Sequence, residues 1–306
     1  MVVTDVNPFY YAAIGGVILG LATSLNYCLR GKVTGMSGML YAIFFWNRCI
    51  HSFIIEDIHE KLSIIGGMLV SAGMFFDVFG YGSSNNFAPY GPELEITKGT
   101  SYLGYALSGL LVGFGTKLGN GCTSGHGLCG IARLSKRSFV AVGTFLLCAL
   151  AISTLRYHKT LGPFSDESLN PQLSYHHLVS ANVIIMVGAL LPLIGGYLYA
   201  TLENNTKTAA EMMLEQLVTF VTGVLFGLGL LVAGMVRRVN ILGFLGLGTD
   251  WNPSLLFVLG CGVMVNLVTF SYMIHYKYSI PYIEKYHISE MLFSTPKTAK
   301  SIGNYS

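Results

Sequence analysis

Long apolar runs separated by short polar or glycine-rich breaks dominate the chain. Several of them approach the ~20 residues that a helix needs to cross the hydrocarbon core of a bilayer. These runs are Tyr10–Tyr27, Leu62–Phe79, Tyr102–Leu118, Phe139–Leu155, Leu178–Leu202, Leu217–Val236 and Leu255–Tyr276. The pattern therefore predicts seven convincing spanning helices.

Two further apolar pieces, Met36–Trp46 and Val239–Leu247, are too short to cross a bilayer simply. Both lie beside glycine-rich breaks, which is typical of re-entrant or broken helices lining a protein-enclosed cavity. We therefore expect an all-α, polytopic integral membrane protein with internal repeats. It would have about seven to nine spanning helices plus short re-entrant or broken helices.

One pattern occurs three times, as "GGVILGLA" (Gly15–Ala22), "SGLLVGFG" (Ser108–Gly115) and "TGVLFGLG" (Thr222–Gly229). Each copy contains Gly-x-x-x-Gly, which places two glycines on one helix face and lets two backbones approach closely. We expect close helix crossings near the centre of the molecule at Gly16, Gly20, Gly109, Gly113, Gly223 and Gly227.

A glycine-rich break bearing basic residues follows each copy. Repeated units of helix, break and short helix are typical of transporters built from structural repeats, with the substrate site at the breaks. The expected organisation is a membrane half over 1–156, a polar linker over 157–177, a second membrane half over 178–276 and a polar tail over 277–306. We expect the tail to contact another chain.

Composition supports a membrane protein. Hydrophobic residues make up 52% of the 306 residues and charged residues only 11%, against about 25% charged in soluble domains. The net charge of +3 is too small to indicate nucleic-acid binding. The six cysteines show no paired extracellular spacing, so no disulfide framework is expected. No cleavable signal peptide is evident, and the first apolar run is interpreted as the first span.

The break after the second copy, "GNGCTSGHGLCGIARLSKRS" (Gly119–Ser138), gathers most of the candidate chemistry. Cys122, His126 and Cys129 stand at a C-x3-H-x2-C spacing, which raises a zinc site or a Cys–His nucleophile as alternatives. A structural zinc site needs four ligands, and the nucleophile pair lacks a third orienting acid. We therefore expect no metal, no cofactor and no enzyme activity.

A third interpretation of this stretch fits its residues better. Glycines free the backbone, and N–H groups at the start of a helix bind anions. Thr123 and Ser124 add hydroxyl donors, and Cys122 adds a soft, weak S–H donor. The stretch thus suits an anion with a soft sulfur end and a hard oxygen end. His126 either contacts that substrate or packs against the backbone, and the sequence leaves both alternatives open.

The stretch "GFGTKLGNGCTSGHGLCGIARLSKRS" resembles the signature of the YeeE/YedE sulfur-transport family, whose members take up thiosulfate. Residues Gly223–Gly262 resemble the companion half-protein found beside that family in bacteria, so the two halves look fused here. The resemblance implies that thiosulfate passes along a central pore by contacts with cysteine thiols.

By this resemblance, Cys122 is the firmest substrate-binding residue, and Cys28, at the break after the first repeat, is the next. The companion half often carries Gly-Gly-Cys at the third break, whereas this chain has Gly234-Met235. Cys261 or the thioether of Met235 is the candidate for that later step.

Further expectations concern the remaining cysteines and the basic residues. Cys49 and Cys148 are expected to be small buried apolar residues. Basic residues at the breaks are expected at a membrane interface; these are Arg133, Lys136, Arg137, Arg237 and Arg238.

The expected partners are thiosulfate or a similar anion, membrane lipid and subunits of a membrane complex. The membrane is a bacterial plasma membrane or a mitochondrial inner membrane. The alternative function is a transporter-derived structural subunit of a larger complex, such as a respiratory complex.

Overall fold

The computed structural model describes residues 8–31, 33–35, 52–78, 102–157, 181–202, 209–236, 238–247 and 251–276. The described residues form nine helical elements: α1 (Pro8–Arg30), α3 (Ser52–Val78), α4 (Tyr102–Leu118), the π-helix η2 (Gly125–Gly130), α5 (Lys136–Tyr157), α6 (Ala181–Leu202), α7 (Ala209–Val232), α8 (Arg238–Leu245) and α9 (Ser254–Tyr276). Each of the seven long apolar runs forms a helix, which confirms the all-helical prediction. The piece Met36–Trp46, most of the predicted linker and the tail lie outside the described residues.

Among the described residues, four helices are long and apolar enough to cross a membrane: Phe9–Arg30, Lys136–Leu155, Met213–Val232 and Ser254–Met273. Two shorter apolar helical stretches, Ala106–Leu118 and Val183–Tyr197, accompany them. The protein is therefore an integral membrane protein. The predicted short piece Val239–Leu247 corresponds to α8, whose 8 residues span only about 12 Å and cannot cross alone.

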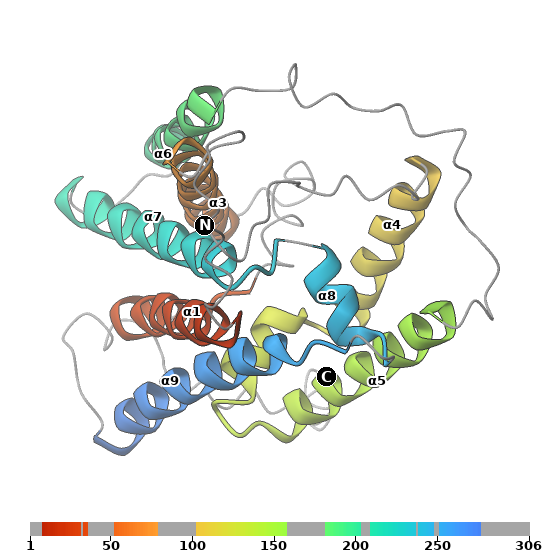
Figure 1. The fold of residues 1–306 in the computed structure, drawn as a ribbon. Helices are drawn as coiled ribbons and strands as arrows, with labels where there is room; N and C mark the ends of the chain where they lie inside the picture. The colour runs from red at the N-terminus through yellow and green to blue at the C-terminus, as the bar shows by residue number, and fades with distance from the viewer. Residues whose placement is uncertain are drawn as a thin grey trace, which may run out of the picture.

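The main helix packing crosses between the two sequence halves. In Figure 1, α1 lies between α7 and α9, while α3 lies beside α6 and α7. η2 connects this assembly to α5, because it contacts α1, α5 and α9. Helices α1, α3, α6, α7 and α9 thus build one packed group, and the break between α4 and α5 lies against it.

The first and third copies of the glycine pattern make equivalent contacts. A Cβ atom at Gly16 would overlap the backbone of Val258 on α9, and one at Gly223 would overlap the backbone of Ile64 on α3. One turn further on, Gly20 lies against Val265 of α9. The first helix of each repeat therefore packs on the last helix of the other.

Gly227 completes the correspondence, since it lies against Met68 and Ser71 of α3. Ile64, Met68 and Ser71 stand at the same spacing as Val258, Gly262 and Val265, which face Gly16 and Gly20. The equal spacing means that the two repeats are related by an approximate two-fold exchange, in which α1 corresponds to α7 and α3 corresponds to α9. The same alignment places Cys28, in the last turn of α1, at the position equivalent to Met235, in the turn after α7.

The second copy behaves differently, and the expectation for Gly109 and Gly113 is wrong in this structure. Both glycines are exposed, and a Cβ atom at either would meet no atom of the described residues within 4 Å. Within the part of the chain that the structure describes, α4 makes no extended packing with another helix. The spacing puts both glycines on one face, but it does not determine that a second helix reaches that face.

The predicted breaks are helix ends with left-handed residues. Gly31 follows α1 with φ +67° and donates its N–H to the carbonyl of Tyr27 at 2.9 Å. Gly234 follows α7 with the same φ and donates to the carbonyl of Leu231 at 2.9 Å. Glycine adopts this conformation without a steric penalty, and it closes both helices in the common C-terminal way.

Candidate functional site

The break between α4 and α5 is built around a close contact between Gly121 and His126. Gly121 has φ +154°, and a Cβ atom there would lie 2.5 Å from His126 Nε2. On its other side, His126 Nδ1 lies 3.0 Å from the hydroxyl of Ser138 on α5. Any side chain at position 121 would displace the imidazole, so the glycine lets the break fold back on itself.

A second glycine serves the same contact. A Cβ atom at Gly130 would overlap the hydroxyl of Ser138, which is itself buried. The half-buried His126 is thus a packed histidine bonded to a side-chain hydroxyl. Of the two alternatives that the sequence left open, the geometry favours packing over contact with a substrate.

Residues Gly125–Gly130 form a π-helix. The N–H of Ile131 bonds to the carbonyl of His126 at 2.9 Å, and the N–H of Ser135 bonds to that of Gly130 at 3.2 Å. Both bonds span five residues. Single π-helical turns are rare and occur frequently at functional sites. The wider turn places Leu128, Cys129 and Gly130 in the protein interior.

Cys122 lies at the entrance to this helical turn. It is half-buried, and its Sγ lies 3.0 Å from the Ser124 hydroxyl. Its carbonyl accepts the N–H of His126 at 2.9 Å, so the helical turn begins directly after it. Thr123 is exposed and Ser124 is half-buried. The thiol and one hydroxyl are therefore close neighbours at a partly open position.

Cys129, which the sequence analysis did not select, lies deeper in the same turn. It is fully buried (0% exposed). Its thiol interacts with the backbone of Thr34 and the hydroxyl of Thr23, and lies within electrostatic range of Arg133 and Cys122. Burial raises the pKa of the Cys129 thiol to about 12, although Arg133 acts in the opposite direction. The sulfur therefore carries its proton at physiological pH and remains a hydrogen-bond donor.

The end of α1 brings Cys28 to the same neighbourhood. The buried Tyr27 lies within electrostatic range of Arg133, Cys28 and Cys129. Cys28 itself is half-buried. Tyr27 is fixed by its ring contact with Phe270 of α9, with ring centroids 4.2 Å apart. Cys129 thus lies near both Tyr27 and Arg133, with Cys28 beside Tyr27 and Cys122 within range of Cys129, and we call Cys28, Cys122 and Cys129 the cysteine cluster.

Asn266 of α9 holds the turn against the helices. Its Nδ2 donates to the carbonyl of Leu128 at 3.2 Å. Its Oδ1 accepts the hydroxyls of Thr23 and Ser24 on α1, each at 2.9 Å. Asn266 is 0% exposed, and an asparagine in the middle of an otherwise apolar helix is the sequence signal that could have identified it.

The remaining sulfur candidates lie on the second half. Cys261 is half-buried on α9, next to Gly262, whose Cβ position lies 2.7 Å from the side chain of Leu128. Met235 is partly buried and packs against the central core. Their participation in a substrate path stays a prediction. Cys148 is exposed on α5, so the expectation of burial was wrong there, because α5 turns that face away from the packed helices. Cys49 lies outside the described residues.

The basic residues of the break divide between two roles. Arg133 is half-buried, and its Nε donates to the carbonyl of Cys129 at 3.3 Å. Arg137 is exposed, yet it donates to the carbonyl of Gly119 at 3.2 Å and ties the start of α5 to the end of α4. Lys136 is exposed. The side chains of Arg237 and Arg238 lie outside the described residues. Arg133 is thus the basic group nearest the cysteine cluster.

The described residues hold no group of three or more His, Cys, Asp or Glu side chains arranged to bind a metal ion. The π-helical turn separates the side chains that stand at the C-x3-H-x2-C spacing. His126 is turned toward Ser138 and Gly121, while the Cys129 thiol lies against Thr23 and Thr34.

Comparisons with known proteins match two families to different parts of the chain. A family model described as sulphur transport matches residues 6–152. A second model, for a family of unknown function (DUF6691), matches residues 212–281. No solved structure matches the chain.

Two relatives from Xylella fastidiosa, strains Temecula1 and 9a5c, are each described as a probable transporter. Each is 32% identical over 148 residues, which are 48% of this chain and 95% of the relative. A second probable transporter of strain 9a5c is 45% identical over 49 residues, which are 16% of this chain and 34% of that protein. Almost the whole of one bacterial protein thus corresponds to about half of this chain, as expected for fused halves.

Proposed function

The chain belongs to the sulphur transport family, and from that premise we propose that it carries thiosulfate across a membrane. The observation that supports this most directly is the cysteine cluster. Cys28 at the end of α1 and Cys129 of the break after α4 lie within electrostatic range of Tyr27, and Cys122 lies within electrostatic range of Cys129. We propose that the protein acts as a carrier or channel and not as an enzyme.

Thiosulfate presents a terminal sulfur and three oxygens, so it suits a site that combines thiols with harder donors. A protonated thiol is a weak, polarizable donor, and the high pKa of Cys129 keeps its proton in place. The Ser124 hydroxyl beside Cys122 supplies an oxygen-directed donor. The anion would contact Cys122 at the partly open position before it reaches Cys129.

Weak donors are what conduction requires. A divalent anion does not cross ~30 Å of hydrocarbon without stabilisation, but a site that binds too tightly also blocks passage. Arg133 is held by the carbonyl of Cys129, so it contributes positive potential from a fixed position. Neutral thiols at successive positions then give the anion steps that it can leave.

The test is uptake of labelled thiosulfate into proteoliposomes that contain the purified protein. Cys122→Ala removes both the donor and the soft sulfur contact, so we expect uptake to be abolished while the protein still folds. Cys122→Ser keeps a shorter donor and should retain little uptake. Cys148→Ala is the matched control, because that cysteine is exposed on α5 and lies apart from the cluster.

The outcomes separate the proposal from its alternative. The thiol path would be supported if the wild-type protein takes up thiosulfate, Cys122→Ala does not, and Cys148→Ala takes it up at the wild-type rate. Wild-type rates in a well-folded Cys122→Ala variant would rule that path out. Absence of uptake in the wild-type protein would favour a transporter-derived structural subunit of a membrane complex.

A further inference from the structure

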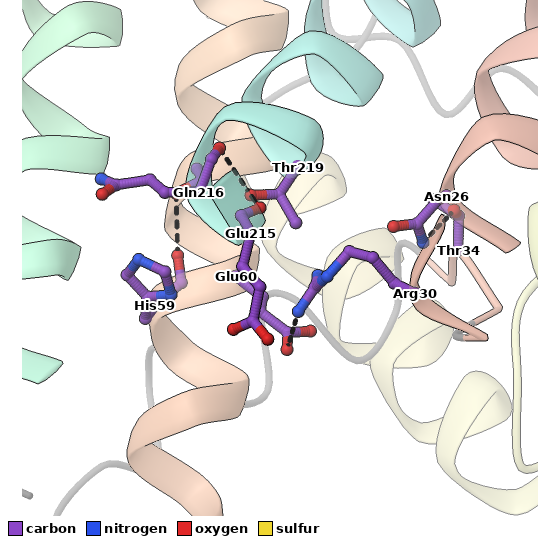
Figure 2. Close-up of polar contacts among 9 residues, drawn as sticks. Asn26, Arg30, Thr34, His59, Glu60, Glu215, Gln216 and Thr219 are labelled. Carbon is purple, nitrogen blue, oxygen red and sulfur yellow. Dashed lines mark hydrogen bonds and ion pairs between the residues drawn. The ribbon is translucent and has the colours of Figure 1, made fainter. Parts of the chain in front are cut away.

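A group of ionisable side chains lies buried between α1, α3 and α7, on the other side of α1 from Asn266. Arg30 of α1 forms an ion pair with Glu60 of α3. His59 lies beside them, within electrostatic range of both, and of Glu215 on α7. Figure 2 shows the carboxylates of Glu60 and Glu215 directed toward the same region as the Arg30 guanidinium. We call these four residues the ionisable cluster.

All four residues of the ionisable cluster are more than nine-tenths buried: Arg30 is 7% exposed, His59 4%, Glu60 6% and Glu215 6%. Arg30 ends one candidate span and Glu215 lies at the start of another, and ionisable side chains buried inside membrane proteins are costly and mark ion or proton pathways. With His59 neutral, these four groups contain one cation and two carboxylates, and therefore one excess negative charge. A proton on His59 or on a carboxylate makes the four groups neutral together.

Helix packing alone does not account for the ionisable cluster. The approximate two-fold exchange places Pro253 and Ser254 at the positions equivalent to His59 and Glu60, and Pro8 at the position equivalent to Glu215. The second helix pair packs with the same register and without any ionisable group at those positions. The histidine and the two carboxylates are therefore an addition to one side of the structure, whereas Arg237 stands at the position equivalent to Arg30.

The surroundings of the ionisable cluster are polar but contribute few further charges. On α6, Gly195 lies 3.4 Å from the His59 backbone, measured from its Cβ position, and the described Tyr197 is exposed. On α3, Lys61 follows Glu60 and is half-buried. On α7, Gln216 interacts with His59. The described titratable groups that face the ion pair thus come from α1, α3 and α7.

Polar groups near the end of α1 lie between the ion pair of Arg30 and the thiol of Cys129. Asn26, one turn before Arg30, donates to the hydroxyl of Thr34 at 3.0 Å, as Figure 2 shows. The backbone of Thr34 in turn interacts with the Cys129 thiol. The end of α1 therefore carries the ion pair on one side and the cysteine cluster on the other.

We propose that Arg30, His59, Glu60 and Glu215 bind a proton, and that proton binding there is coupled to anion binding at the cysteine cluster. This inference rests on the proposed thiosulfate transport. A proton on Glu60 removes the charge that compensates Arg30, and the freed positive charge then favours a nearby anion. By linkage, the bound anion favours the protonated cluster to the same extent. His59 and Glu215 pass the proton to and from the ion pair.

The experiment uses the full chain in proteoliposomes with a pH-sensitive dye inside and the membrane potential clamped. An inward proton gradient should drive accumulation of labelled thiosulfate, by about tenfold per coupled proton for each pH unit. A protonophore should abolish that accumulation. Added thiosulfate should acidify the lumen of vesicles that contain the wild-type protein, which is a readout that needs no variant.

Glu215→Gln is the diagnostic variant, since it leaves the Arg30–Glu60 pair in place. It should lose gradient-driven accumulation but keep the exchange of labelled for unlabelled thiosulfate, which requires no net proton movement and also reports on folding. Lys117→Gln removes an exposed charge at the end of α4 and should keep both activities.

Three results would overturn the inference. Wild-type uptake that is independent of the proton gradient, with no lumenal acidification, would rule out the coupling and leave the proposal of thiosulfate transport intact. Full gradient-driven accumulation in Glu215→Gln would place the proton elsewhere. No thiosulfate movement in either uptake or exchange by the wild-type protein would overturn the transport proposal, and the coupling with it.

Discussion

The side-chain amide of Asn266 donates a hydrogen bond to the carbonyl of Leu128 at 3.2 Å, across the contact between α9 and η2. A backbone carbonyl inside a membrane protein has no water to bond with, so it needs a partner in the protein. The wider spacing of the π-helix leaves such a carbonyl pointing at α9. This single contact therefore places the turn that carries Cys129 against the two central helices.

We expect Asn266→Leu to destabilise the protein by about 1–3 kcal/mol, the cost of leaving a buried polar group unsatisfied. Thr23 keeps its bonds to carbonyls of its own helix, so the main loss is at Leu128. Thermal unfolding in detergent measures the effect. Thr269→Val, which removes one hydroxyl of the same helix, is the control and should cost less. Equal melting temperatures for Asn266→Leu and the wild-type protein would contradict this role.

The glycines of the repeats give a matched pair of substitutions. A Cβ atom at Gly16 would overlap the backbone of Val258, whereas one at Gly109 would meet nothing within 4 Å. Gly16→Ala should therefore lower stability by about 1–3 kcal/mol, as overpacking does. Gly109→Ala should raise it by up to about 1 kcal/mol through helix propensity. The same melting experiment reads both, and a similar loss for the two variants would show that α4 packs closely on another helix.

The positions of the helices were predictable, because an apolar run of about 20 residues has few stable forms other than a helix in a bilayer. The breaks were predictable for a similar reason, since Gly31 and Gly234 can adopt the left-handed conformation that ends α1 and α7. The contacts at Gly16 and Gly223 were also expected from their spacing. Local sequence thus determined both where each helix runs and where it stops.

The partners of those helices were not predictable from the same signals. Gly109 has the spacing of Gly16, yet the described structure brings no helix to it. Cys129 was considered only as part of a zinc or nucleophile site, and only the π-helical turn shows which thiol is buried. Arg30 and Glu60 meet across two helices, and no local pattern connects them. Both residues lie just outside the predicted apolar runs, Tyr10–Tyr27 and Leu62–Phe79, so the runs did not draw attention to them.

The bond between His126 and Ser138 gives a third test. We expect Ser138→Ala to cost about 1–3 kcal/mol, because it leaves a largely enclosed imidazole nitrogen without its hydroxyl partner at 3.0 Å. Ser153→Ala removes a half-buried hydroxyl from the same helix and serves as the control in thermal unfolding. Uptake should fall together with stability, since the histidine supports the turn that carries the thiols. An unchanged melting temperature would show that the imidazole finds another partner.

The reactivity of the two cysteines in the turn should differ sharply. Thiolate is the form that alkylating reagents attack, and burial raises the pKa of Cys129 to about 12. At pH 8 a thiol with that pKa is ionised in about one molecule in ten thousand, against roughly a quarter for an ordinary cysteine. Cys122 is half-buried beside Ser124, so we expect maleimide to label it well before Cys129.

Mass spectrometry of the labelled peptides in native detergent measures both cysteines in one sample, because a protease cut after Leu128 or a fragment spectrum separates them. In denaturant the burial is lost, the pKa of Cys129 returns toward its ordinary value, and the two residues should label alike. Raising the pH toward 12 in the native state should speed the labelling of Cys129 for as long as the fold persists. Equal native rates at neutral pH would mean that Cys129 is open to solvent, which would contradict its place deep in the proposed anion path.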